Sequence, residues 1–378
     1  MSDTDRITMF AVGPDDPAEK SDWMEAISRA IDENSFCLGS ATERFESRCQ
    51  ELLGVAHAIG VSSGTDGLKV ALAAVGVGAG DEVILPAFSF FSTASVIAQL
   101  GATPVFVDLD ADTLCVCPHL VAEKINDKTA AILPVHLYGQ TAQMDPLLEL
   151  SKNYSVPIVE DAAQAFGVRY RGEPAGTMGA AGAFSFYPTK NLAAAGDAGM
   201  VVCQDDDLAD RIRSLRVHGD VGGYRHESLG WNARMDGFQA AILLVRLAKL
   251  EKQQSIRLRN ATEYTEALTK LDLMDRVTPL GRTEGSDHCW HQYIIRVEAR
   301  DRLREELAQR GIDTGVYYPG TLPQQNCFAY LGHSPGDFPV AQSAAGSIVA
   351  LPVHHRLQEG DPTRVVEVIH EVMEIVAG

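Results

Sequence analysis

The sequence has no uninterrupted apolar run of about 18 residues, the length that a membrane-spanning helix requires. Its N-terminal stretch, MSDTDRITMF, also lacks the basic start and the apolar run that are typical of a secretory signal. These two absences favour a cytoplasmic protein.

Basic residues are scarce and scattered. The 378-residue chain has 32 lysines and arginines against 51 aspartates and glutamates, a formal net charge of −19, and no cluster of five or more basic residues. We therefore expect no nucleic-acid partner, because such proteins neutralise phosphates with basic patches. The acidic balance also means that a few placed groups, rather than the overall field, would hold an anionic substrate.

Cysteine is sparse too, and its positions fit neither a disulfide framework nor a zinc site. The number is odd, and the one close pair, Cys115 and Cys117, has a single intervening residue and no second pair beside it. We expect reduced, mostly buried thiols and no metal. The seven cysteines are residues 37, 49, 115, 117, 203, 289 and 327.

What the sequence does contain is an alternation of short apolar strands with helical patterns. Runs rich in Val, Ile and Leu, typical of strands buried on both faces, lie at 56–61, 82–86, 104–108, 130–136 and 157–161. Helical patterns long enough for crossovers lie between them, at 66–75, 92–100, 118–125 and 145–153. The strands GAFSFYP and GMVVC follow. This alternation predicts an α/β fold with a mostly parallel central sheet.

The length predicts two domains, because single cores seldom exceed roughly 250 to 300 residues. A long helical pattern from about Met235 to Leu268 marks the expected junction. The residues after it are mixed, with the strand WHQYIIRV and a final helix from Pro362. The prediction is a large domain over 1–250 and a smaller α+β domain over 251–378.

Three motifs at expected strand ends carry candidate chemistry, since open α/β sheets bind ligands there. In the first, VSSGTDGLKVAL, a strand runs into a turn and then into an amphipathic helix. Free backbone N–H groups and the helix dipole at such a turn suit a phosphate. The same pattern is also typical of an ordinary helix N-cap.

The other two motifs contribute a carboxylate and an amine. In PIVEDAAQAFG, Asp161 ends a buried strand, where a carboxylate is costly unless it faces a positive partner. Gln164 shares its face if a helix begins there, and a capping role for Asp161 is the alternative. In AFSFYPTKNL, Lys190 stands at the rim of an apolar strand, where a lysine of lowered pKa acts as a Schiff-base nucleophile and proton carrier, although most lysines are simply solvated.

The order of these motifs, with the aromatic PAFSFFST among them, matches the needs of pyridoxal phosphate. That cofactor requires donors for its phosphate, an anion for its ring nitrogen, a flat apolar cover and a lysine for its aldehyde. At these residues the chain resembles the DegT/DnrJ/EryC1/StrS aminotransferases, from about residue 26 to the C-terminus. The motifs that carry the resemblance are SSGTDGL, GDEVILPAFSFFSTA, GATPVFVDLD, PVHLYGQ, VEDAAQA, FSFYPTKNL and GWNARMDGFQAAIL.

The resemblance implies the type I PLP-dependent aminotransferase fold and a role for each matching residue. Lys190 matches the catalytic lysine that joins the cofactor aldehyde and moves the substrate proton. The implied cofactor-binding residues are Asp161 at the pyridine nitrogen, Gln164 at the 3′ oxygen, Phe88 on the ring, and Gly64, Thr65, Asp66 and Ser185 at the phosphate. Asn232 resembles an asparagine that reaches the phosphate from the neighbouring subunit, which implies a homodimer with shared active sites.

The resemblance also implies a ping-pong transamination from L-glutamate to a nucleotide-linked keto sugar, in an antibiotic or polysaccharide pathway. The runs FSFYPTKNLAAAGDAGM and GVYYP resemble enzymes that aminate C-3, including those that act on UDP-linked 3-keto sugars. Two departures from the family weaken the C-3 interpretation and point to an unusual substrate. Ala193 and Ala194 stand where glycine is common, and YYPGTLPQQNCF replaces the usual Pro-Leu-His-x-Gln pattern of a loop that contacts the sugar. Arg225, His291 and Tyr317 are candidate substrate-binding residues, with surface or packing roles as the alternative.

Other functions remain open at this point. A C-4 keto-sugar aminotransferase and a keto-inositol aminotransferase would use the same cofactor residues. A regulatory protein that retains the cofactor would do so without turnover. Relatives that dehydrate sugars at C-3 resemble this chain less, because they carry histidine where it has Lys190.

Overall fold

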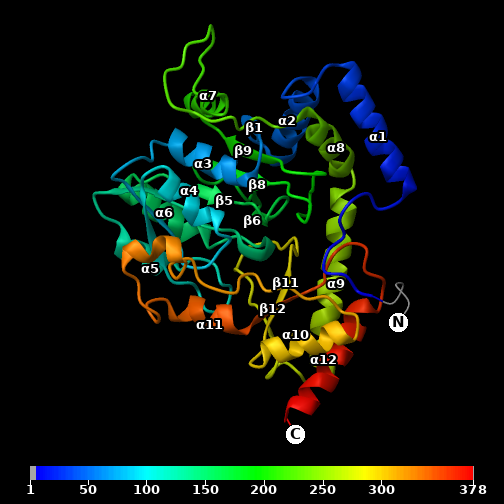
Figure 1. Cartoon of the computed structure of the whole chain (residues 1–378). Coiled ribbons are helices and arrows are strands. Elements are labelled where there is room, and N and C mark those ends of the chain that lie inside the picture. Colours follow the sequence, from blue (N-terminus) through cyan, green and yellow to red (C-terminus); the bar gives the residue numbers. More distant parts are fainter. Residues whose placement is uncertain (1–5, 378) are drawn as a thin grey trace.

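The computed structural model describes residues 6–377, and its centre is a mixed β-sheet flanked by helices (Figure 1). The strands of this sheet are β1 (His57–Val61), β2 (Glu82–Pro86), β3 (Thr103–Val107), β4 (Thr129–Ile132), β5 (Val159–Asp161), β8 (Ala181–Ser185) and β9 (Gly199–Cys203). They lie in the orders β3-β2-β4 and β5-β8-β9-β1. Parallel bridges of Ile132 with Ile158 and of Val135 with Asp161 join β4 to β5.

The predicted, mostly parallel sheet is confirmed. Among these strands β9 alone runs antiparallel to its neighbours, β8 and β1. All five residues of β9 and the last four of β2 are buried, which accounts for their nearly continuous apolar sequences. A short hairpin of β6 (Arg169–Tyr170) and β7 (Glu173–Pro174) lies outside the sheet. The parallel strands bring Asp161 and Ser185 to the same edge of the sheet, at the ends of β5 and β8.

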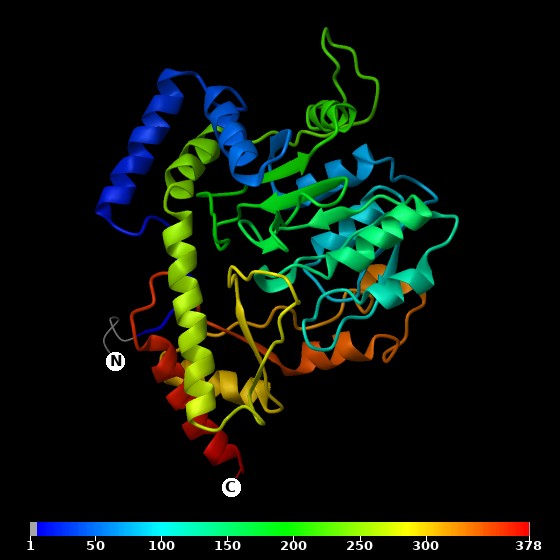
Figure 2. The same ribbon diagram turned by 180° about the vertical axis from the view of Figure 1, so that it is seen from behind.

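Most helices of the large domain pack on the sheet or on one another (Figure 2). They are α1 (Pro17–Asp32), α2 (Ser40–Leu53), α3 (Gly64–Ala74), α4 (Ser92–Gln99), α5 (Pro118–Lys124), the short η2 (Leu137–Gly139), α6 (Met144–Tyr154), α7 (Asp206–Leu215) and α8 (Gly237–Leu247). Helix α3 begins at the turn in VSSGTDGLKVAL that the sequence suggests for a phosphate. There the Ser63 side chain accepts a hydrogen bond from the Asp66 amide. The predicted turn and helix therefore form as the sequence indicates.

The single long helix expected from Met235 to Leu268 is wrong in one respect. The structure has two helices there, α8 and α9 (Leu250–Lys270), separated at Ala248 and Lys249. The Lys249 amide donates to the Arg246 carbonyl, three residues back, which tightens the chain locally. The break allows α8 to pack on α1 and α2 while α9 runs on into the C-terminal domain.

A second core lies in the C-terminal part of the chain, between an antiparallel sheet and three helices. The sheet is β10 (Thr278–Pro279), β11 (Tyr293–Arg296) and β12 (Ile348–Leu351), in that order. It packs with α9, α10 (Arg300–Gln309) and α12 (Asp361–Ala377). Buried members of this core include Tyr264, Tyr293, Leu303, Val349 and Ile369.

Each of the two cores contains residues from the other side of the predicted boundary at residue 250. Ile7 forms a parallel bridge with Ile312 and belongs to the C-terminal core. In the other direction, Phe328 of η3 (Asn326–Leu331) and Ala341 of α11 (Pro339–Ser347) pack in the core of the large domain. The segment around Ile7 and the 326–347 segment therefore tie the two cores together.

One segment projects from the body of the molecule. Residues 218–231 form a long loop beyond α7 (Figure 1), and Tyr224 and Leu229 are 90% and 95% exposed. Large apolar side chains this exposed are typical of a surface that another molecule covers. None of the helices within residues 6–377 is long and apolar enough to cross a membrane.

Candidate active site

The predicted catalytic residue, Lys190, and most of the predicted cofactor-binding residues line one cavity of about 540 Å³ at the carboxyl edge of the sheet. Its walls come from the start of α3, the end of β5, the loop after β8 and the segment around Tyr317. Of the predicted site residues, those that line it are Gly64, Thr65, Asp161, Gln164, Ser185, Lys190, His291 and Tyr317. Predicted site residues up to 253 positions apart in the sequence, Gly64 and Tyr317, thus meet in one place.

Asp161 is a buried carboxylate held by two donors. The Thr93 hydroxyl donates to its Oδ2 at 2.8 Å, and the Ala163 amide donates to its Oδ1 at 3.2 Å. Burial raises the pKa of Asp161, and these hydrogen bonds together with the charge of Lys190 oppose that rise. A cationic ring nitrogen beside Asp161 would supply the positive partner that a buried carboxylate requires.

The strand that carries Asp161 is fixed by a second buried carboxylate. Glu160 accepts hydrogen bonds from the amides of Gly176, Met178 and Gly179 at 2.7, 2.7 and 2.6 Å. It also lies 2.8 Å from His136 Nε2. Because this network holds the end of β5 rigidly, it fixes the direction of the Asp161 side chain.

Lys190 lies in the loop after β8, and the charge of its amine lowers the pKa of Asp161 more than any other charge nearby does. Burial lowers the pKa of Lys190 to about 8, while the charge of Asp161 raises it. A lysine of this pKa is neutral in a substantial fraction of molecules near neutral pH, as a nucleophile requires. Its predicted place at the rim of an apolar strand agrees with this environment.

The start of α3 and Ser185 form a narrow cradle. The first turn of a helix leaves its N–H groups without helical acceptors, so the amides of Gly64 and Thr65 are available to a ligand. A side chain at position 64 would not fit, because a Cβ there would lie 2.7 Å from the Ser185 Cβ. Asp66 lies at the back of this turn: its amide donates to Ser63 and its carboxylate pairs with Lys69 at 2.9 Å.

Gln164 is oriented by hydrogen bonds at both ends of its amide. Its Oε1 accepts from the Tyr138 amide at 2.6 Å, and its Nε2 donates to the Tyr318 hydroxyl at 3.1 Å. One N–H of Gln164 therefore remains for a ligand oxygen. Phe88 is fully buried behind the cavity lining and packs edge-on against Tyr318, with 6.0 Å between ring centroids.

Asn232 and Arg225 lie outside this cavity. Asn232 lines a neighbouring cavity of about 360 Å³ together with Ser62, Arg234 and Asp236, and Asp197 borders both cavities. Arg225 lies in the exposed 218–231 loop, where its Nε is 3.4 Å from the Gly222 carbonyl. Neither residue meets the catalytic cavity within one chain.

Several residues that surround the cavity were not anticipated from the sequence. They are Phe10, Ser89, Phe90, Thr93, Tyr187, Asn191 and Tyr318. Thr93 follows Ser89 by four residues, and this helical spacing was the one sequence feature that could have predicted the contact between their hydroxyl groups. Phe10 gave no signal, because its contact with Tyr317, at 6.2 Å between ring centroids, joins opposite ends of the chain.

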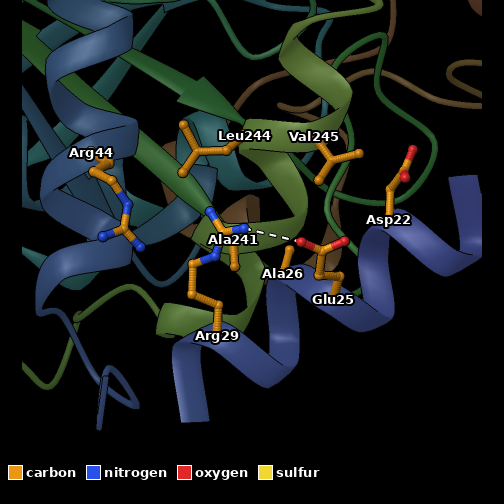
Figure 3. A pocket seen from close by; sticks show the side chains of 8 residues that line it. All are labelled: Asp22, Glu25, Ala26, Arg29, Arg44, Ala241, Leu244 and Val245. Atoms are coloured by element: carbon orange, nitrogen blue, oxygen red, sulfur yellow. Dashed lines mark hydrogen bonds and ion pairs between the residues drawn. The ribbon is translucent and has the colours of Figure 1, made fainter. Parts of the chain in front are cut away.

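A separate groove lies between α1, α2 and α8 (Figure 3). Arg29 pairs with Glu25 at 3.1 Å along α1, and Ala241, Leu244 and Val245 of α8 form the apolar side of the groove. An exposed ion pair of this kind contributes little stability. None of the predicted site residues borders the groove.

The residues around the catalytic cavity fit the cofactor that the sequence suggests. The cradle offers amides and a hydroxyl for a phosphate, Asp161 offers an anion for a ring nitrogen, and Lys190 offers an amine for an aldehyde. The cradle is also too narrow for a side chain at position 64, which is typical of a turn that approaches a ligand closely.

Comparison with known proteins gives the same result. The sequence model of the DegT/DnrJ/EryC1/StrS aminotransferase family matches residues 17–370. A pleiotropic regulatory protein of Geobacillus stearothermophilus is 42% identical over 93% of this chain and 94% of its own length. A dTDP-3-amino-3,4,6-trideoxy-alpha-D-glucose transaminase of Streptomyces venezuelae is 41% identical over 93% of this chain and 92% of its own length.

A solved structure extends the likeness to the fold. The crystal structure of S. venezuelae DesV in complex with a ketimine intermediate matches with a TM-score of 0.93 and 38% identity. The match covers 97% of this chain and 98% of that one. The type I aminotransferase fold is therefore confirmed along nearly the whole chain.

Proposed function

The chain belongs to the DegT/DnrJ/EryC1/StrS aminotransferase family, and we propose that it transfers an amino group from L-glutamate to C-3 of a nucleotide-linked 3-keto sugar. It is a sugar aminotransferase, and its cofactor is pyridoxal 5′-phosphate. The observation that carries the proposal is the single cavity that brings together Lys190, Asp161 and the cradle of Gly64 and Ser185.

The cofactor, when bound, supplies an aldehyde that accepts amines and a ring that withdraws electrons from the substrate carbon. Asp161 holds the proton on the ring nitrogen, because a buried carboxylate is stabilised by a positive neighbour. The amides of Gly64 and Thr65 and the Ser185 hydroxyl hold the phosphate. Lys190 Nζ takes a proton from the substrate carbon and returns it later, and its pKa of about 8 suits both directions.

The proposal for C-3 rests on sequence likeness. The S. venezuelae relative, at 41% identity, is named for a 3-amino sugar. The segment after the catalytic lysine, NLAAAGDAGM, also resembles that of enzymes which aminate C-3. Tyr317 lines the cavity and is available to the sugar, whereas Arg225 would require a second subunit to come near it.

We further propose a homodimer in which Asn232 reaches the phosphate of the partner. The support is that Asn232 lines its own cavity beside the catalytic one, and that Asp197 borders both. The exposed 218–231 loop, with Tyr224 and Leu229, is a suitable surface for the second copy. If the two subunits are related by a two-fold axis, each subunit would supply its Asn232 to the phosphate site of the other.

A regulatory role without turnover is the second candidate, because the G. stearothermophilus relative is named a regulatory protein. The two functions differ in their response to L-glutamate. An enzyme converts the bound cofactor to its amine form and loses its visible absorbance. A protein that only senses the cofactor keeps that absorbance.

The proposed function is tested by a screen of amino sugars in the reverse direction. The cofactor-loaded protein is mixed with UDP-, dTDP- and GDP-linked 3-amino and 4-amino sugars and with an amino-inositol. Loss of visible absorbance with a 3-amino sugar nucleotide supports the proposal. A response confined to a 4-amino sugar or to the amino-inositol assigns one of the alternatives instead.

A further inference from the structure

Asn191, the residue after the catalytic lysine, fixes which nitrogen of His291 carries a proton. The Asn191 Nδ2 donates to the Cys289 carbonyl at 2.7 Å, so its Oδ1 faces His291 Nδ1 at 3.2 Å. A carbonyl oxygen only accepts, which determines the orientation of the amide. His291 Nδ1 must therefore carry the hydrogen, and His291 Nε2 is left with a lone pair.

His291 is neutral as well as oriented. It is 6% exposed, and Asn191 is 7% exposed. Burial, and after it the charges of Lys190 and Arg257, lower the pKa of His291 well below its usual value. Because Nδ1 is the donor, Nε2 stays an acceptor throughout the physiological pH range.

No protein donor reaches His291 Nε2 among the residues that the structure describes, although the side chain borders the catalytic cavity. Nε2 is not among the described side-chain atoms that are fully buried without a partner, so it is accessible from the cavity and a donor from a ligand can reach it. The phosphates of a nucleotide and the carboxylates of glutamate offer only acceptors to it. The amine of glutamate is the group that the cofactor aldehyde takes up, and the ribose hydroxyls of a nucleotide are separated from the reacting carbon by the diphosphate. A hydroxyl group of a sugar offers a donor.

We propose that His291 Nε2 accepts a hydrogen bond from a hydroxyl of the sugar on a carbon next to the one that is aminated. This inference rests on the proposed function, and it names the hydroxyl group of the substrate that His291 would recognise. His291 is tied to Asn191, the neighbour of Lys190, and Lys190 must reach the reacting carbon. The hydroxyls near that carbon are those on the adjacent ring positions. His291 thus selects a keto sugar that has such a hydroxyl over one that lacks it.

Two variants separate this binding role from a structural one. The amide of H291N takes the place of Nδ1 and can still contact Asn191, but nothing replaces Nε2. The longer side chain of H291Q places its amide where Nε2 lies, so its oxygen can accept the same hydrogen bond. A structural role predicts that H291N is the milder change, and the proposed role predicts the opposite.

The test uses the cofactor-loaded enzyme and two probes, dTDP-3-amino-3,6-dideoxyglucose and L-glutamate. The rate at which each probe removes the visible absorbance is followed against probe concentration. We expect H291N to raise the half-saturating concentration of the amino sugar about five- to tenfold, the range for one neutral hydrogen bond, with the L-glutamate value unchanged. H291Q should recover most of the loss.

The outcomes separate the two levels of inference. If the wild-type enzyme reacts with the amino sugar and H291N has the wild-type half-saturating concentration, the role of His291 is wrong and the proposed function stands. An equal effect of H291N on both probes also overturns the role, because it indicates a structural change. If the wild-type enzyme reacts with L-glutamate but with no amino sugar nucleotide, the proposed function itself fails.

Discussion

Thr93 donates its hydroxyl hydrogen to Asp161 Oδ2 at 2.8 Å, from 68 residues away in the sequence. Ser89 lies 2.9 Å behind it, hydroxyl to hydroxyl, so a short chain of hydroxyl groups ends on the carboxylate. Thr93 is fully buried. The carboxylate that is expected to hold the ring nitrogen is therefore held in turn by α4.

We predict that Thr93→Val weakens cofactor binding about tenfold or more, because a hydrogen bond to a charged group is lost without a change of shape. The pKa of Asp161 should rise further, since one of the groups that oppose its rise is removed. Dialysis equilibrium with pyridoxal phosphate measures the affinity. Thr93→Ser, which keeps the hydroxyl, is the control and should remain near wild type. Wild-type affinity in the valine variant would contradict the role.

Lys190→Ala should abolish the visible absorbance between about 400 and 430 nm that reports the covalent attachment of the cofactor. Transaminase activity should fall by about 100-fold or more, since the group that moves the proton is lost. Spectra before and after addition of L-glutamate, with an activity assay, check both effects. An intact absorbance band in this variant would count against the assignment.

The stability of the cofactor-free protein should depend on pH through Lys190. Its pKa is lowered from 10.5 to about 8 on folding, so the unfolded chain binds one more proton between these values. The free energy of unfolding should rise across this window, by on the order of 3 kcal/mol at most, relative to Lys190→Met. Urea unfolding of both proteins at pH 7.5 and about pH 10 measures the difference. A constant difference would show that the amine is not buried in this way.

Gly64→Ala should destabilise the protein by about 1 to 3 kcal/mol and weaken cofactor binding, because its Cβ would lie 2.7 Å from the Ser185 Cβ. The matched control is Gly78→Ala, where an added Cβ meets nothing within 4 Å. That variant should stay within about 0.5 kcal/mol of wild type. Chemical unfolding and cofactor titration of both variants provide the measurement. Equal effects at the two glycines would contradict the narrow cradle.

The proposed sharing of Asn232 predicts complementation between two inactive proteins. If Asn232→Ala and Lys190→Ala are unfolded together and refolded, mixed dimers should contain one intact site each. About a quarter of the wild-type activity should return in an equal mixture, because half of the dimers are mixed and half of their sites are intact. Neither variant refolded alone should show it. No recovery in mixtures shown to contain mixed dimers would exclude the crossing of Asn232 between subunits.

Much of the site was accessible from the sequence because it depends on local patterns. A strand that ends in Asp161 and another that leads to Lys190 place both residues at one edge of a parallel sheet, whatever the details of packing. Ser63 and Gly64 predict the start of α3, because serine and glycine are residue types that favour a helix N-terminus. These rules need no knowledge of distant contacts.

The remaining features depend on contacts between distant parts of the chain. The hydrogen bond from Thr93 to Asp161 and the pairing of Asn191 with His291 join residues 68 and 100 positions apart. The break between α8 and α9 contains neither proline nor glycine. The helical pattern of the sequence therefore continues across Ala248 and Lys249, and it predicted one helix where the structure has two. Tertiary packing, rather than helix propensity, decides such a break.

The contacts of residues 7–10 have a consequence for how the protein is made. Thr8 accepts a hydrogen bond from His354, 346 residues later, and Phe10 forms part of the cavity wall beside Tyr317. A ribosome releases the early segment long before its partners exist, so it must wait undocked while the rest is synthesised. The wall of the reaction chamber is therefore complete only after synthesis has passed Tyr317, 307 residues after Phe10.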